Sequence, residues 1–286
     1  MYFLTFSHLH SDFYDSTMSN RFFEGASHAD QYIKFRPTYS EEVCQKILRF
    51  LNEKRPPPHQ LLVDVGCGSG QGTYGLSSQF ERVIGFDVSP AQVEAATKEN
   101  TFPNVEFKVS PAETLPLDDQ SVDLITCFEA VHWFDFDEFC NECRRVLKQN
   151  GCLAIINYGD YKIEHEDEHI TKNLERYFKE LERDLEKFWL SKGKFAQDGL
   201  PGLQLPFPQS LREESLQLRC KWSVSQITGY IRSCSAFQRQ LKTNPSDQVI
   251  KDYQSKVMSA VASPSSSPDD VILNIVWPLT LLLGRI

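Results

Sequence analysis

The chain has 286 residues, a formal net charge of -9 at pH 7 and 8 cysteines. Its length suffices for one large α/β domain, with or without a lid. The negative charge disfavours a nucleic-acid partner, because such binding needs clustered Lys and Arg to displace counterions, and it favours a small molecule. The cysteines are scattered through apolar or helical contexts, so we expect reduced thiols and a cytoplasmic protein.

Neither end of the sequence resembles a membrane anchor. The first residues, MYFLTF, are mostly apolar, but the basic segment of a secretory signal is missing. Residues 271–286 are apolar too, yet Asn274 and Pro278 interrupt them and the stretch is too short to span a bilayer. We expect no membrane partner, and a leader over residues 1–27 that need not be ordered.

From residue 41 onward the apolar pattern alternates between helical and extended periods. A helix over 41–51 ends before Pro56. The sequence then predicts strands over 61–65, 82–88, 105–109, 122–128 and 152–157, with helices over 70–79, 90–100 and 137–148 between them. Short apolar strands that alternate with helices predict a parallel sheet covered on both faces, and right-handed crossovers make that sheet doubly wound.

After residue 160 the pattern changes to one apolar stripe on a long charged helix over 170–189, which needs a partner surface. A strand over 215–222 and helices over 224–241 and 246–261 follow, and a Ser- and Pro-rich loop precedes a last strand over 271–283. We therefore expect a core over 28–160, a helical lid with one strand over 161–261, and a segment over 262–286 that completes the sheet.

A glycine-rich turn ends the first expected strand. Asp64 is followed by Gly66, Gly68 and Gly70, which let the backbone turn sharply and approach a ligand where a Cβ would block it. A dinucleotide fingerprint would place its third glycine at position 71, which is Gln71, so the spacing disfavours an NAD dehydrogenase. The turn therefore favours another nucleotide-like cofactor.

Asp87 ends the second expected strand about twenty residues after this turn, where its carboxylate can accept both hydroxyls of a ribose. The two features, with Ala112-Glu113 and residues 123–134, resemble the successive motifs of the Rossmann-like (class I) S-adenosylmethionine-dependent methyltransferases. YIKFRPTY over 32–39 and AVHWF over 130–134 resemble the trans-aconitate methyltransferase-like group within them. The resemblance implies an α/β, doubly wound, mostly parallel seven-stranded sheet with a helical lid.

The resemblance also implies S-adenosyl-L-methionine as cofactor and S-adenosyl-L-homocysteine as product. Asp64 and Gly66 would face the methionine moiety, Asp87 would hold the ribose, and Phe128 with Glu129 would line the entry to the methyl group. These positions follow strand ends, where ligands of open α/β sheets bind. The expected cofactor residues are Tyr32, Asp64, Gly66, Gly68, Gly70, Asp87, Val88, Ala112, Glu113 and Phe128.

The acceptor should contact the remaining polar and aromatic residues near the strand ends. His132 is either a general base or substrate contact, or a packed residue that positions its loop. A carboxylate acceptor is already ionised near neutral pH, so His132 would then orient rather than deprotonate. Arg36 suits a carboxylate by its two-pronged geometry, whereas Lys34 and Arg232 are better explained as solvated charges. The candidate catalytic residues are His132 and Arg36, and the candidate acceptor contacts are Arg36, Tyr39, His132, Trp133, Tyr230 and Arg232.

The leading hypothesis is methyl transfer to a small molecule, with a carboxylic acid as the candidate acceptor. A protein acceptor and a catalytically silent cofactor-binding regulator are the alternatives. Residues 28–39 and 160–261 are expected to form a mobile cover over the site.

Two motifs with metal-site spacing are interpreted as chance matches. His165 and His169 fit H-E-x-x-H but lie in a run of charge, and Cys140 and Cys143 have no second cysteine pair nearby. We therefore expect no metal.

Overall fold

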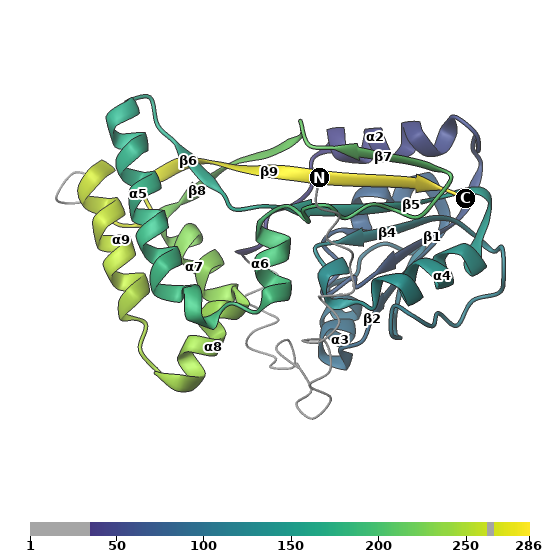
Figure 1. Ribbon diagram of the computed structural model, residues 1–286, viewed down its shortest axis with the longest axis horizontal. Coiled ribbons are helices and arrows are strands. Elements are labelled where there is room, and N and C mark those ends of the chain that lie inside the picture. The colour runs from purple at the N-terminus through teal and green to yellow at the C-terminus, as the bar shows by residue number, and fades with distance from the viewer. Residues whose placement is uncertain (1–34, 262–265) are drawn as a thin grey trace, which may run out of the picture.

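The computed structural model describes residues 35–261 and 266–286 (Figure 1). Its core sheet has the order β3-β2-β1-β4-β5, and all these neighbours are parallel. The five strands are β1 (His59–Val65), β2 (Phe80–Asp87), β3 (Val105–Val109), β4 (Val122–Phe128) and β5 (Leu147–Tyr158). Each overlaps the segment that the sequence predicted, and the doubly wound, mostly parallel α/β fold is confirmed.

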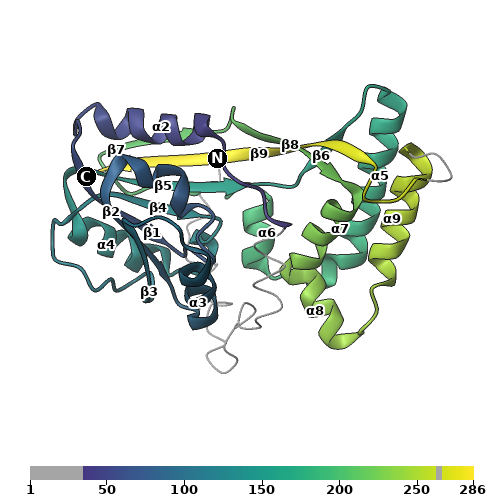
Figure 2. The same ribbon diagram turned by 180° about the vertical axis from the view of Figure 1, so that it is seen from behind.

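Successive residues of the core strands bury their side chains on opposite faces of the sheet. On one face Leu62 and Leu124 pack with α2 (Glu41–Asn52), and on the other Val63 and Ile125 pack with α4 (Phe136–Val146). Figure 2 shows these two helices on opposite sides of the strands. Helix α3 (Pro90–Glu99) joins β2 to β3. The sheet is therefore covered on both faces, as its apolar strands require.

The segment after the glycine-rich turn is not the α-helix that the sequence predicted over 70–79. It is the 3-10 helix η2 (Thr73–Gln79), which contains Gly75, Ser77 and Ser78. These residues are poor α-helix formers. A second 3-10 helix, η3 (Val131–Trp133), follows β4.

The region after residue 160 holds three strands where the sequence predicted one. All three pair antiparallel with the last strand, β9 (Ile272–Arg285), so the described residues form a nine-stranded sheet rather than the predicted seven-stranded one. The division into core, lid and final segment remains a proposal, with three strands in the lid. The elements of this region are β6 (Lys162–Glu164), α5 (Glu168–Leu185), η4 (Glu186–Phe188), α6 (Ser191–Gln197), β7 (Gln209–Glu213), β8 (Gln217–Ser223), α7 (Val224–Ser233), α8 (Ser235–Thr243) and α9 (Gln248–Val261).

The helix predicted over 224–241 is broken into α7 and α8. Cys234 between them has an extended backbone, with φ -74° and ψ 141°. The hydroxyl of Ser233 donates to the carbonyl oxygen of Tyr230 at 2.7 Å. A serine that bonds to the backbone one turn earlier competes with helix continuation, which explains the break.

Strand β9 runs through both parts of the molecule (Figure 1). Its C-terminal half pairs with β5 and β7, and its N-terminal half pairs with β6 and β8. The halves meet at Pro278, whose carbonyl oxygen accepts from the backbone N–H of Gly159 at 3.0 Å. Core and lid therefore share one continuous strand.

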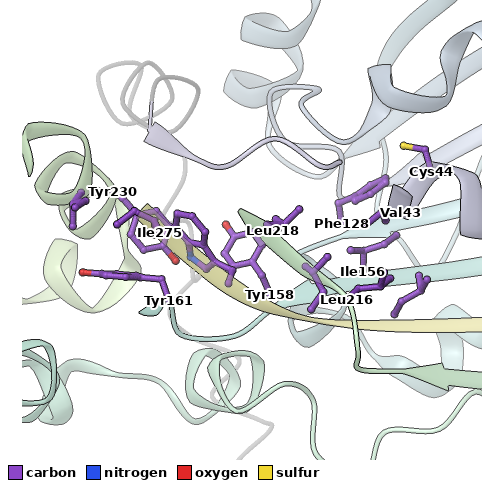
Figure 3. Packing of buried hydrophobic residues seen from close by; sticks show 14 of the residues in the cluster. Val43, Cys44, Phe128, Ile156, Tyr158, Tyr161, Leu216, Leu218, Tyr230 and Ile275 are labelled. Carbon is purple, nitrogen blue, oxygen red and sulfur yellow. The ribbon is translucent and has the colours of Figure 1, made fainter. Parts of the chain in front are cut away.

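A single apolar cluster also crosses the junction between core and lid. Figure 3 shows it running from Tyr230 and Tyr161 in the lid, past Tyr158, to Phe128 and Val43 in the core. Trp277, which is fully buried, lies 4.8 Å to 6.4 Å between ring centroids from four aromatic neighbours: Tyr158, Tyr161, Trp222 and Tyr230. Lid and core are thus packed against each other as well as hydrogen-bonded through β9.

Candidate cofactor site and acceptor pocket

The glycine-rich turn adopts backbone angles that favour glycine. Gly66, Gly68 and Gly70 have φ values of 70°, 52° and 90°. A Cβ on Gly66 would lie 2.4 Å from the Cβ of Ala130, which follows β4, so this glycine is required for packing. A Cβ on Gly68 would meet only the Oε1 atom of Gln92 at 3.9 Å. Gly68 therefore presents the open side of the turn, where a ligand can approach the backbone.

Asp64 is fully buried beneath this turn. Its two carboxylate oxygens accept hydrogen bonds from the hydroxyls of Thr73 at 2.6 Å and Thr126 at 2.9 Å. Burial raises the pKa of this carboxyl to about 7. Asp64 thus ties η2 and β4 to the turn. That it also faces the methionine moiety remains a prediction.

Asp87 and its neighbours form the other half of the expected cofactor site. The carboxylate accepts from the backbone N–H of Gly68 at 2.9 Å and from that of Ser89 at 2.8 Å, and burial raises its pKa. Next to it Val88 is 71% exposed, and Val109, the β3 partner of Asp87, is 52% exposed. An acceptor of hydroxyl groups thus lies beside bare apolar side chains, an arrangement that fits a ribose and its base.

Several residues expected to contact the cofactor make contacts within the protein, and their role at the cofactor remains a prediction. Ala112 is buried, and the Oε1 atom of Glu113 accepts from the backbone N–H of Asp135 at 2.8 Å, at the start of α4. Phe128 is buried against Gly72 and lies 4.4 Å from the ring of Tyr39. Phe128 and Tyr39 therefore contribute to the core rather than to an open site. Tyr32, and likewise Lys34, lies outside the described residues.

A cavity of about 890 Å³, including the part that opens to solvent, lies beyond the ends of β4 and β5. It brings together Arg36, His132, Trp133 and Tyr230, four of the residues predicted to bind the acceptor. Arg232 is not among them, because its guanidinium pairs with Asp247 at 3.8 Å, as expected of a solvated charge. The other lining residues are Glu129, Tyr158, Gly159, Asp160, Tyr161, Phe178, Leu181, Glu182, Leu185, Trp189, Gly193, Ala196, Gln197, Ile231, Cys234 and Ser235.

Arg36 and His132 are the basic side chains in the wall of this pocket. A guanidinium N–H of Arg36, on Nη1, donates to the hydroxyl of Tyr158 at 2.7 Å, and the group lies 5.0 Å from the ring centroid of Tyr230. Burial and, to a smaller extent, the positive charges of Arg36 and Lys192 lower the pKa of His132 to about 3. The imidazole is therefore neutral, and its buried Nδ1 atom has no hydrogen-bond partner among the described residues.

Two half-buried carboxyl groups also face the cavity. Burial raises the pKa of Glu129 to about 8, against the opposing effect of Arg36. Burial and the neighbouring Glu182 raise the pKa of Asp160 to about 8, and Asp160 accepts from the Nε2 atom of Gln197 at 2.8 Å. Asp160 lies just beyond a predicted strand end, a position that could have marked it. Glu182 lies on α5 and Gln197 on α6, and no sequence pattern indicated that they reach the pocket.

The histidine and cysteine motifs show no metal site. The Nδ1 atom of His165 accepts from the backbone N–H of Asp167 at 3.0 Å, at the start of α5. Cys140 and Cys143 are buried on α4. Within residues 35–261 and 266–286, no group of three or more His, Cys, Asp or Glu side chains is placed to hold a metal ion. In the same ranges no helix is long and apolar enough to cross a membrane.

Comparison with known proteins agrees with this geometry. Residues 63–155 match a family model described as a methyltransferase domain. A protein of Dictyostelium discoideum named as a methyltransferase is 31% identical over 254 residues, which cover 89% of this chain and 91% of that one. A protein of Saccharomyces cerevisiae named as an S-adenosylmethionine-dependent methyltransferase is 31% identical over 144 residues, 49% of this chain and 47% of its own length.

A solved structure from Anaeromyxobacter dehalogenans, described as a type II methyltransferase, has the same fold. It is 29% identical in sequence, its TM-score is 0.70, and the match covers 88% of this chain and 98% of that one. The open face at Gly68, the carboxylate of Asp87 and the exposed Val88 fit the cofactor of such enzymes. The chain therefore belongs to the class I S-adenosylmethionine-dependent methyltransferases.

Proposed function

We propose that this enzyme methylates a small-molecule acceptor bound in the cavity beyond β4 and β5, and that the acceptor is a carboxylic acid methylated on oxygen. The observation that carries the proposal is the position of the cavity. Its wall includes Glu129 and His132, and Ala130 between them touches Gly66 of the cofactor turn. An acceptor in the cavity would therefore lie beside the cofactor.

Positioning can supply much of the rate of this reaction. Bound S-adenosylmethionine supplies an electrophilic methyl group on a sulfonium, and methyl transfer is an in-line displacement that depends on alignment. Gly68, Asp87 and Val88 are the residues that would hold the cofactor. The pocket residues would then fix the acceptor at the methyl group.

Arg36 is the residue that favours a carboxylate acceptor. Its guanidinium is held by Tyr158 and Tyr230 on the wall of the cavity. Arginine binds carboxylates through paired N–H donors. A carboxylate needs no base, and a neutral His132 with a pKa of about 3 is suited to orienting the acceptor rather than deprotonating it. The aromatic side chains that line the cavity, such as Trp133, Phe178 and Trp189, suit the apolar part of an acceptor.

The trans-aconitate methyltransferase-like grouping is part of the proposal. It is supported by Arg36, His132 and Trp133, which belong to the two segments that carry the resemblance and share one cavity. A cytoplasmic location is supported by the eight cysteines, none of which forms a disulfide. A protein acceptor and a silent regulator are the alternatives that an experiment must separate.

The proposal is tested with Arg36→Ala and, as a matched control, Arg219→Ala, which removes an exposed arginine paired with Glu164. Calorimetry measures S-adenosylhomocysteine binding, and transfer of labelled methyl groups is measured on panels of carboxylic acids and of peptides. We expect turnover on an acid, lost at least about ten-fold in Arg36→Ala with unchanged cofactor affinity, because a charged hydrogen bond contributes about 1.5 to 3 kcal/mol. Turnover on peptides alone would favour a protein acceptor, and cofactor binding without turnover would favour a regulator.

A further inference from the structure

Glu129 has a backbone conformation that usually requires glycine. Its φ is 55°, in the left-handed region. A non-glycine residue there costs roughly 1 to 2 kcal/mol, and such residues cluster at functional sites. Two hydrogen bonds hold the conformation: its backbone N–H donates to the carbonyl oxygen of Ile156 at 2.9 Å, and its Oε1 atom accepts from the backbone N–H of Tyr158. The side chain is thereby fixed in the wall of the cavity.

The charged and titratable groups around Glu129 come from several elements that border the cavity. Arg36 precedes α2, His132 lies on η3, Asp160 follows β5, Glu182 lies on α5, and Lys192 on α6 acts on His132. Arg36 is the cation that stabilises the ionised form of Glu129, and burial outweighs it, so that the pKa rises to about 8. At neutral pH the carboxyl therefore keeps its proton. Because Oε1 accepts from Tyr158, the proton belongs on Oε2.

We propose that Glu129 binds the acceptor as a protonated carboxyl group, donating a hydrogen bond from Oε2 to the same carboxylate that Arg36 holds. This assignment rests on the proposed function and adds the second half of the carboxylate site. Arg36 and Glu129 together form the acid clamp.

The chemistry of the reaction supports a donor rather than a base. A carboxylate has no proton to lose: its oxygen attacks the methyl carbon, the carbon–sulfur bond breaks, and the electron pair stays on sulfur. No proton moves, and Glu129 keeps its own throughout. An ionised Glu129 would repel the acceptor. Conversely, a bound anion raises the pKa of Glu129 further, so binding above neutral pH must take up a proton.

Proton uptake is therefore the measurement. The full chain, saturated with S-adenosylhomocysteine, is titrated with phenylacetate in two buffers that differ in ionisation enthalpy. The aromatic walls suit this probe, and phenylacetamide is its neutral, near-isosteric control. We expect phenylacetate to take up about half a proton or more at about pH 8.5 and much less at about pH 6.5, where Glu129 is already protonated. Phenylacetamide should take up none.

Variants separate Glu129 from the rest of the site. Glu129→Gln keeps a donor but has no proton to gain, so phenylacetate should bind to it with clearly less proton uptake than to the wild type and more tightly than to Glu129→Ala. Any remaining uptake belongs to Asp160, whose pKa in the same cavity is also about 8. Glu164→Gln, at an exposed position on β6, is the control and should behave like the wild type. Phenylacetate binding without uptake in the wild type, uptake that is undiminished in Glu129→Gln, or no phenylacetate binding at all would overturn the clamp. If S-adenosylhomocysteine itself fails to bind, the proposed function fails instead.

Discussion

At the level of single residues, Asp87 is the carboxylate placed to hold the cofactor's ribose. Asp87→Ala removes an ionised acceptor and should raise the dissociation constant of S-adenosylhomocysteine at least about ten-fold, since such hydrogen bonds contribute about 1.5 to 3 kcal/mol. Because burial raises the pKa of Asp87, affinity in the wild type should also weaken as the pH falls through that raised pKa. Calorimetry measures both effects. Asp118→Ala, at an exposed position, is the control, and equal affinity in the two variants would remove Asp87 from the site.

The buried carboxyl group of Asp64 should make the free energy of unfolding depend on pH. Its folded-state pKa of about 7 lies above the ordinary value, so the folded state binds the proton more tightly than the unfolded state. Stability should therefore fall as the pH rises from about 4 to about 7 and stay level above that. Asp64→Asn removes this dependence. In urea denaturation, the free energy of unfolding of the variant relative to the wild type should increase across that pH window. Parallel pH profiles would contradict the assignment.

At the level of elements, the glycine-rich turn combines two requirements that substitutions can separate. Gly66→Ala places a Cβ 2.4 Å from that of Ala130 and should destabilise the fold by about 1 to 3 kcal/mol, as overpacking does. In Gly68→Ala the new Cβ would lie in open space, so the variant should fold and lose only the small stability cost of an alanine at positive φ. It should nevertheless lose cofactor binding. Thermal unfolding and calorimetry measure the two effects.

Gly202 provides the matched control for this pair. Its φ is 74°, and a Cβ there would meet nothing within 4 Å. Gly202→Ala should therefore show the cost of positive φ alone, with normal cofactor affinity. If Gly68→Ala binds S-adenosylhomocysteine as well as Gly202→Ala does, the cofactor does not approach the turn at Gly68.

At the level of the whole molecule, β9 limits how the lid can move. Residues 160–261 were predicted to form a mobile cover together with residues 28–39, of which 28–34 lie outside the described residues. Within the described part, β6 and β8 pair with the same strand as β5 and β7. A closing lid would have to bend β9, and Pro278 with Gly159 marks the junction. The mobile cover remains a prediction, restricted to motions that keep these ladders.

A shared strand and a shared apolar cluster predict that core and lid unfold together. Trp277→Ala removes a fully buried side chain at the junction and should cost about 3 to 5 kcal/mol. Denaturation followed by fluorescence and by hydrogen exchange should show one transition for peptides of α4 and of α9. Phe102→Ala, at an exposed position, is the control and should cost far less. Separate transitions for core and lid would show that β9 does not couple them.

The sequence by itself determined the order of the core elements, the glycine-rich turn and the carboxylate after the second strand. These features depend on local spacing: alternation of apolar residues locates strands, and only glycine adopts the left-handed turn readily. Asp87 and Gly68 therefore lie where the spacing placed them, 2.9 Å apart between carboxylate oxygen and amide nitrogen.

Tertiary structure alone decided which distant residues meet. Periodicity shows which face of a helix is apolar but not what covers it, so the stripe on α5 gave no hint that Glu182 shares a cavity with Arg36. Partial burial likewise shifts the pKa values, because desolvation disfavours the charged form: the pKa of His132 falls to about 3 and that of Glu129 rises to about 8. The pairing of three lid strands with β9 also joins segments far apart in the chain, which no local pattern specifies.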